Sequence, residues 1–187
     1  MTIGLPRMHA EAGERRDFLP PFIAGLENNG YRIFLEHGYG TGMGLSEADY
    51  REAAPSVRFA SWEQTYQQDL VLVLRYPGDA VVRWMQHSGS CLISMLHYPT
   101  RPQRVEWLRS LGVKAISLDS IKDDNGRRLV ENLQAVAWNG VEVAFQVLAK
   151  TYPPPGLESP QRPPLQVTLL GAGSVGAHVM QAAIRYG

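Results

Sequence analysis

Residues 166–176 have the sequence QVTLLGAGSVG, a short apolar segment followed directly by the spacing Gly171-x-Gly173-x-x-Gly176. Between a strand and a helix, this spacing is typical of a dinucleotide-binding fold. The first glycine permits a tight turn, the second lets a pyrophosphate approach the backbone, and the third lets the helix pack closely on the strand. The alternative is a glycine turn that binds no nucleotide. The motif predicts a strand over 166–170, a helix from about Ser174, and the candidate cofactor-binding residues Gly171, Ala172, Gly173, Ser174, Val175 and Gly176.

The sequence before this motif predicts a domain boundary. Residues 151–164 contain six prolines and few apolar side chains, which is typical of a linker or surface loop. Apolar positions between Leu133 and Leu148 fall on one stripe of a long helix. We therefore predict an α/β domain over 1–131, a connecting helix over 132–150, a linker over 151–164 and the beginning of a dinucleotide-binding domain over 165–187.

The first 131 residues alternate short apolar runs with segments of helical period, which favours βαβ units and a parallel sheet. The run 69–74 (DLVLVL) is apolar throughout after its first residue, so it predicts a central strand. The predicted fold is an α/β Rossmann-like (flavodoxin-like) parallel sheet with flanking helices, joined to the first βα unit of a truncated Rossmann domain. The expected strands cover 2–5, 31–35, 69–74, 90–96 and 113–118, and the expected helices cover 21–28, 46–54, 61–64 and 102–111.

Composition narrows the classes of partner. The 187 residues are 44% apolar and carry 18 basic and 18 acidic side chains, so nothing draws the chain to a polyanion and we expect no nucleic-acid partner. The N-terminus lacks a signal-peptide pattern and no apolar run would cross a bilayer, which predicts a cytoplasmic protein without a membrane partner. The lone Cys91 lies in an apolar run, and the histidines have no metal-ligand spacing, so we expect no metal.

Several stretches carry a family resemblance when they are taken in chain order. They are 1–6 (MTIGLP), 14–20 (ERRDFLP), the glycine-rich 38–50, the strand 69–77, the strand that ends before His97, the strand 115–120, the long helix after Leu133 and the Gly171 motif. In this order and at this spacing they resemble the alanine dehydrogenase and pyridine-nucleotide transhydrogenase (alpha subunit) family over its N-terminal portion. The resemblance implies two Rossmann-like domains with an active site between them and hydride transfer between a 2-amino acid and NAD, with NADP left open. It also implies a small amino-acid or keto-acid substrate and a homo-oligomer.

The resemblance assigns roles to two residues. Arg15 matches the basic residue that holds the substrate carboxylate, for which the forked guanidinium is well shaped; the alternative is that Arg15 and Arg16 are a solvated pair. His97 matches the histidine that exchanges a proton with the substrate, and it also follows the carboxyl end of a predicted strand, where α/β sheets place ligands. A purely structural histidine is the alternative.

Arg75 departs from the resemblance, since the family carries a lysine there. Arginine stays charged, so Arg75 is able to bind an anion but not to move a proton. The departure keeps two alternatives open beside an NAD-linked dehydrogenase: a ligand-binding or regulatory homologue without turnover, and a transhydrogenase alpha-type fragment. His97 favours the dehydrogenase, because the transhydrogenase branch tends to lack this histidine. We expect residues 1–187 alone to be inactive.

Overall fold

A computed structural model describes residues 1–9, 17–86 and 89–185, which leaves Arg15 outside the described residues. The chain separates into two compact units, Met1–Val130 and Glu131–Gly187, and each is described by itself.

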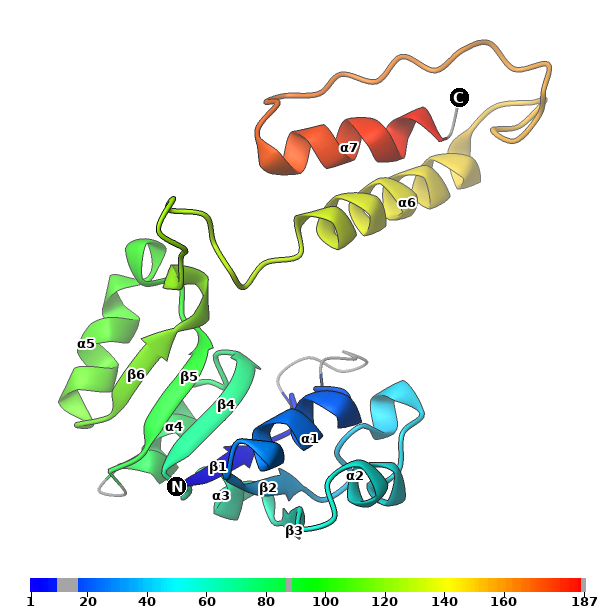
Figure 1. The fold of residues 1–187 in the computed structure, drawn as a ribbon. Helices are drawn as coiled ribbons and strands as arrows, with labels where there is room; N and C mark the ends of the chain where they lie inside the picture. The colour runs from blue at the N-terminus through cyan, green and yellow to red at the C-terminus, as the bar shows by residue number, and fades with distance from the viewer. Residues whose placement is uncertain (10–16, 87–88, 186–187) are drawn as a thin grey trace. The chain divides into compact units, whose positions relative to one another are not determined.

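The first unit is built on one parallel sheet of six strands (Figure 1). Its strand order, β3-β2-β1-β4-β5-β6, is the 3-2-1-4-5-6 order of dinucleotide-binding Rossmann folds. The Rossmann-like parallel fold predicted from the sequence is therefore confirmed, and so is the central position of β4, which pairs with β1 and β5. The strands are β1 (Thr2–Leu5), β2 (Arg32–Glu36), β3 (Arg58–Ala60), β4 (Leu70–Arg75), β5 (Cys91–Met95) and β6 (Lys114–Ser117).

Helices cover both faces of this sheet, and each face has its own apolar core. On one face α1 and α2 cover β1 and β2 through a cluster that includes Ile23 and Tyr50. On the other face α3 contacts β1 and β2, while α4 and α5 share a cluster with β4 and β5 that includes Val82 and Leu108. The helices are α1 (Pro20–Asn28), α2 (Glu47–Ala53), α3 (Trp62–Thr65), α4 (Asp79–Val82) and α5 (Pro102–Ser110), with short 3₁₀ turns at Thr41–Met43, Arg83–Met85, Tyr98–Thr100 and Leu118–Ser120.

Local sequence signals account for several element ends. Ser46 and Asp49 form a reciprocal capping box at the start of α2, and Ser61 and Gln64 form another at the start of α3, within one residue of where the sequence predicts these helices to begin. Gly30 follows α1 with φ of 83°, in the left-handed conformation that favours glycine. The edge strand β3 and the four-residue α4 were not predicted, because elements this short carry no recognisable apolar period.

Gly4 permits a close approach between β1 and α3. A Cβ at this position would stand 1.8 Å from the carbonyl oxygen of Thr65, a backbone atom that moves only if the α3 end moves. The absence of a side chain at Gly4 therefore allows the α3 end to pack against the middle of the sheet.

Replacing Gly4 by Ala is expected to lower the free energy of unfolding of the first unit by about 1–3 kcal/mol, the usual cost of overpacking a core. Gly25→Ala is the matched control, because a Cβ there meets no atom within 4 Å and lies in α1. The control should stabilise the protein by about 0.5–1 kcal/mol through the helix preference of alanine. Urea unfolding followed by circular dichroism measures both, and equal midpoints for Gly4→Ala and the parent protein would contradict the packing argument.

The second unit consists of two packed helices and an extended connection (Figure 1). They are α6 (Leu133–Thr151) and α7 (Ser174–Ile184), and α7 begins at the predicted residue. The strand expected over 166–170 is not formed: among the described residues no other strand pairs with it, so its backbone runs extended without a ladder. A single segment that lacks a neighbour cannot form a β-sheet.

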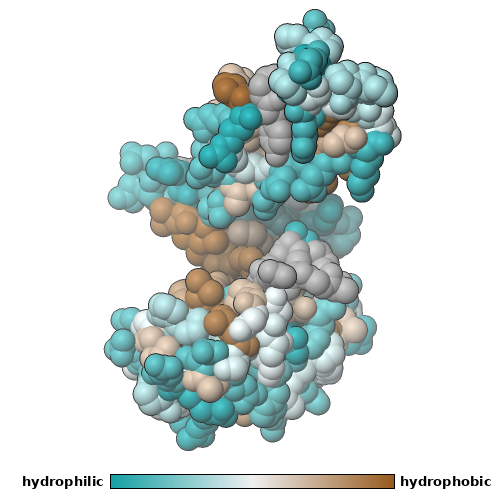
Figure 2. All heavy atoms as spheres, turned by 90° about the vertical axis from the view of Figure 1, so that its right-hand side faces the viewer, coloured by the Kyte–Doolittle hydropathy of each residue, from teal (hydrophilic) through white to brown (hydrophobic). Residues whose placement is uncertain are grey.

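Apolar side chains remain exposed on the second unit. Leu170 is 93% exposed and Ile184 is 73% exposed. Figure 2 shows that hydrophobic residues are exposed at several places among the hydrophilic ones. No helix in the described part of the chain is both long enough and apolar enough to cross a membrane. The other large exposed apolar side chains of this unit are Val136, Val143, Val147, Leu148, Val167, Leu169, Val175 and Met180.

Candidate active site

The carboxyl ends of the strands gather polar and charged side chains at one edge of the first unit. Because all six strands are parallel, the residues that follow β1, β2, β4, β5 and β6 lie at the same edge. The direction of strand addition reverses between β1 and β4, and such a reversal opens the crevice in which α/β folds bind ligands. The candidate site is therefore this edge.

His97 follows β5 and is held in an unusual backbone conformation. Its φ of 51° is the only positive value among the described non-glycine residues, and this left-handed conformation costs an ordinary residue roughly 1–2 kcal/mol. The carboxylate of Asp119 fixes it: Oδ1 accepts the backbone amides of Leu96 at 3.1 Å and of His97 at 3.2 Å. Backbone strain that is held by surrounding hydrogen bonds is a recurring property of functional positions.

Asp119 also faces the His97 ring. Its Oδ2 lies 3.5 Å from Nδ1 of His97, while the ring is 55% exposed. None of the described residues hydrogen-bonds Nε2 of His97, so that nitrogen faces no protein partner in this part of the chain. A histidine ordered through Nδ1 with its other nitrogen accessible is arranged for proton exchange with a ligand.

The ionisation of Asp119 is set by its partners. Burial alone would raise the pKa of Asp119, but the hydrogen bonds from the Ser117 hydroxyl and the His97 amide, together with the charge of the His97 ring, hold it below the ordinary value. Asp119 is therefore a carboxylate at neutral pH, and it is only 8% exposed. A buried charge of this kind is stable only because its hydrogen bonds are satisfied.

Arg75 ends β4 beside Met95 of β5, so it reaches the same edge as His97. Tyr76 follows it, and its hydroxyl donates to Asp79 at 2.6 Å. Burial raises the pKa of Tyr76, and the hydrogen bond to Asp79 raises it further. The Arg104 guanidinium lies 4.0 Å from the Tyr76 ring centre and donates to the carbonyl of Leu96 at 3.0 Å. Arg104 thus ties the loops after β4 and β5 together.

A second polar cluster follows β1 and β2. The buried Glu36 carboxylate accepts the amide of Arg7 at 2.7 Å and contacts the His9 ring at 2.6 Å. Asp17 accepts the amide of Gly40 at 2.8 Å, which anchors the glycine-rich loop. Burial raises the pKa of Asp17, against the opposing effects of the Gly40 amide and of the Arg7 and His9 charges. These contacts were not predicted, because they join segments about 20 to 30 residues apart in the sequence.

In the second unit, each glycine of the 171–176 motif has a different local environment. Gly171 has φ of 97°, which favours glycine. A Cβ on Gly176 would stand 2.4 Å from the Gly171 carbonyl oxygen, so the turn packs against α7 there. Gly173 has an ordinary φ of −71° and a Cβ on it would meet no atom within 4 Å. Neither backbone conformation nor packing requires glycine at 173, and this fits a position left bare for a ligand.

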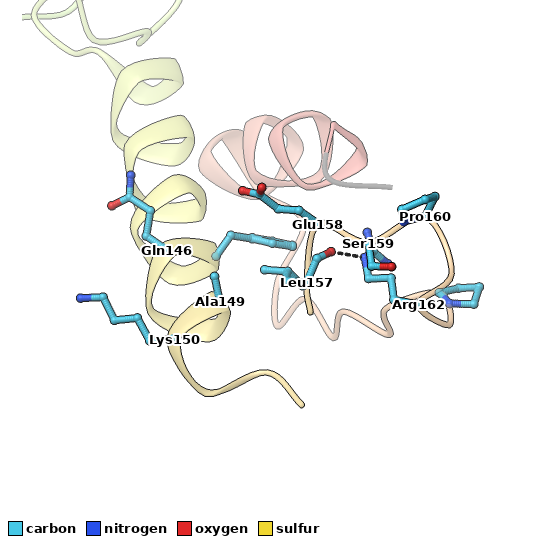
Figure 3. A pocket seen from close by; sticks show the side chains of 10 residues that line it. Gln146, Ala149, Lys150, Leu157, Glu158, Ser159, Pro160 and Arg162 are labelled. Carbon is cyan, nitrogen blue, oxygen red and sulfur yellow. Dashed lines mark hydrogen bonds between the residues drawn. The ribbon is translucent and has the colours of Figure 1, made fainter. Parts of the chain in front are cut away.

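One pocket of the second unit lies between the end of α6 and the proline-rich segment (Figure 3). It encloses about 800 Å³, and Lys150, Glu158 and Arg162 are its charged side chains. Arg162 donates to the carbonyl of Leu157 and so closes the loop on itself. None of the residues that line it is a histidine or cysteine, and we assign it no chemistry. Nor do any three His, Cys, Asp or Glu side chains gather as a metal site in the described part of the chain.

The structure brings together only some of the predicted site residues. Arg75 ends β4 and His97 follows the neighbouring strand β5, so both lie at the same edge of the sheet. The Gly171–Gly176 motif belongs to the other unit, and Arg15 lies outside the described residues. Asp119 was missed, although the rule that singled out His97, a polar residue just past the end of a strand, applies to it as well.

Comparison with known proteins identifies the family. The sequence profile described as "Alanine dehydrogenase/PNT, N-terminal domain" matches residues 4–137. The chain is 25% identical to the alanine dehydrogenase of Bacillus subtilis and 23% identical to that of Geobacillus stearothermophilus; each match covers all of this chain and 50% and 51% of the relative.

Solved structures agree with this fold. An L-alanine dehydrogenase superimposes with a TM-score of 0.82 at 24% identity, and a transhydrogenase from Sinorhizobium meliloti with 0.71 at 15% identity. All of this chain is covered in both cases, against 53% and 57% of those chains. The chain thus spans about half the length of the curated relatives it matches, and its matched residues, 4–137, place it in the alanine dehydrogenase/PNT family, of which it carries the N-terminal domain.

Proposed function

We propose that the first unit is the substrate-side domain of an NAD-linked oxidoreductase that interconverts a small 2-amino acid and its 2-oxo acid. The observation that carries this proposal is His97, which Asp119 holds at the ligand-binding edge of the sheet with one ring nitrogen accessible. Family membership supports the reaction class, since the relatives it matches are alanine dehydrogenases.

In this proposal His97 transfers the proton and the arginines bind the anionic substrate. His97 takes up the proton released as the amino acid becomes the oxo acid and returns it in the reverse direction. Arg75 is always charged, so it binds and polarises an oxygen of the substrate while Arg15 holds its carboxylate. The permanent charge of Arg75 excludes it from the proton transfer itself.

The 171–176 motif is the proposed place of the cofactor. NAD bound there would supply the hydride chemistry of the reaction. The amides at the start of α7 would face the pyrophosphate, and the bare Gly173 fits its close approach, since no packing requires glycine there. NADP remains the alternative cofactor.

A ligand-binding homologue without turnover is the second candidate. Arg75 favours it, because arginine stands where the family resemblance places a lysine. The two candidates differ in one measurable property, which is turnover.

The test follows NADH absorbance with ammonium and a panel of 2-oxo acids, using the longest gene product that contains this chain. We expect NADH oxidation with at least one acid and none from residues 1–187 alone. Gly173→Ala should raise the KM for NADH about tenfold or more without changing the melting temperature, because its methyl group would occupy the space that the proposed site leaves for the pyrophosphate. Gly176→Ala is the packing control and should lower the stability of the second unit by about 1–3 kcal/mol. Absence of turnover with every acid would favour the binding candidate, and an unchanged KM in Gly173→Ala would remove the cofactor assignment.

A further inference from the structure

A pocket of about 300 Å³ opens beside His97. All of its lining residues belong to the first unit, and they include His97, Thr100, Asp119, Ser120, Lys122 and Arg128. This small cavity is therefore lined by two cations, two hydroxyls and the ring that is proposed to exchange a proton. Its size is at the lower end of the range for small-molecule sites.

A tight hairpin turn presents the two cations together. Lys122 and Arg128 are directly opposite each other in an antiparallel bridge. The turn between them is fixed by Asp123, whose Oδ1 accepts the amides of Asn125 at 3.0 Å and Arg127 at 2.8 Å. Because side chains of directly opposed residues lie on the same face, the two positive heads point to one side of the hairpin.

These two charges have no acidic partner within the described residues. Neither Lys122 nor Arg128 forms an ion pair there, although like charges at opposed positions repel each other. Asp119 is the carboxylate of the pocket, and its oxygens already accept the amides of Leu96 and His97 and face the His97 ring. Asp123 is occupied by the turn. The pocket thus has an excess of positive charge that a bound anion would neutralise.

We infer that Lys122 and Arg128 bind a second carboxylate of the substrate, which makes the substrate a 2-oxo or 2-amino dicarboxylic acid. This inference rests on the proposed function, in which Arg15 and Arg75 serve the carboxylate and carbonyl at C1 and C2. Arg75 does not line this pocket, so the hairpin is a separate cationic site adjacent to His97. A guanidinium with a neighbouring ammonium suits a carboxylate, and the hydroxyls of Thr100 and Ser120 supply further donors.

The test is isothermal titration calorimetry of residues 1–187 with oxaloacetate, 2-oxoglutarate, pyruvate and inorganic phosphate. One dicarboxylate is expected to bind about 10- to 100-fold more tightly than pyruvate, because pyruvate leaves the paired cations without an anion. Arg128→Gln should remove that preference and leave pyruvate binding unchanged. Lys122→Gln should also reduce the preference for the dicarboxylate over pyruvate.

Arg127→Gln is the matched control, because it removes the same charge from the same exposed turn but does not line the pocket. It should keep the full preference. Equal affinity for dicarboxylates and pyruvate, equal losses in Arg127→Gln and Arg128→Gln, or phosphate binding as tightly as either dicarboxylate would overturn the inference.

Failure of the inference is distinguishable from failure of the proposed function, since binding requires no turnover. If NADH is oxidised only with a monocarboxylic acid and Arg128→Gln has no effect on ligand binding, the dicarboxylate inference is wrong and the proposed oxidoreductase function stands. A dicarboxylate preference that depends on Arg128, without turnover by the longest gene product that contains this chain, supports the binding site and contradicts the oxidoreductase proposal.

Discussion

Replacing His97 by Asn is expected to lower kcat/KM of the longest gene product that contains this chain by about 10²- to 10⁴-fold, the usual contribution of a positioned acid–base group. The expectation follows from the ordering of the ring, with Nδ1 3.5 Å from Asp119 and no described residue bonded to Nε2. Asn keeps a polar side chain but cannot exchange a proton near neutral pH. The loss should therefore lie mainly in kcat.

Asn is the sharpest substitution here because it tolerates the left-handed backbone that His97 adopts with φ of 51°. The amides of Leu96 and His97 should keep their bonds to Asp119, so the free energy of unfolding should change by no more than an ordinary surface substitution changes it, about 0.5 kcal/mol. Steady-state kinetics and thermal unfolding on the same preparations separate the two effects. A variant that retains parental kcat would remove His97 from the mechanism.

Replacing Asp119 by Ala is expected to lower the free energy of unfolding of the first unit by about 3 kcal/mol. The change leaves the amides of Leu96 and His97 and the hydroxyl of Ser117 without their acceptor at a site that is 8% exposed. Buried donors that lose their partner cost about 1–3 kcal/mol each, although relaxation recovers part of the sum. Asp124→Ala is the matched control, because it removes the same charge from an exposed position in the nearby turn and should cost less than about 0.5 kcal/mol.

The same variant predicts a pH dependence with a definite sign. The pKa of Asp119 is lower in the folded protein than its ordinary value of 3.8, so the carboxylate adds stability at any pH above that value. This contribution is lost as the pH falls through the folded-state pKa. The stability difference between the parent and Asp119→Ala should thus be constant near neutral pH and shrink below about pH 4. A difference that grows on acidification would contradict the lowered pKa.

Short-range signals were enough to predict much of the local structure. Ser46 and Ser61 begin helices because their hydroxyls accept first-turn amides a few residues away. The apolar run 69–74 predicted the central strand β4 because a strand covered on both sides needs apolar residues on both of its faces. The prediction of a strand over 166–170 was wrong, because a strand also needs a hydrogen-bonding neighbour and none is present in the described residues.

The class of fold, the parallel sheet, the position of His97 past a strand end and the glycine motif were predictable from the sequence, because each depends on residues close together in the chain. Three contacts became known only from the fold: Asp119 holds His97, Glu36 joins the segments after β1 and β2, and Lys122 and Arg128 share a pocket with the histidine. These contacts join residues about 20 or more positions apart in most cases, and strand order and register fix which of them meet. Apolar periodicity specifies which face of an element is buried, but it carries no information about which distant loop will supply a partner.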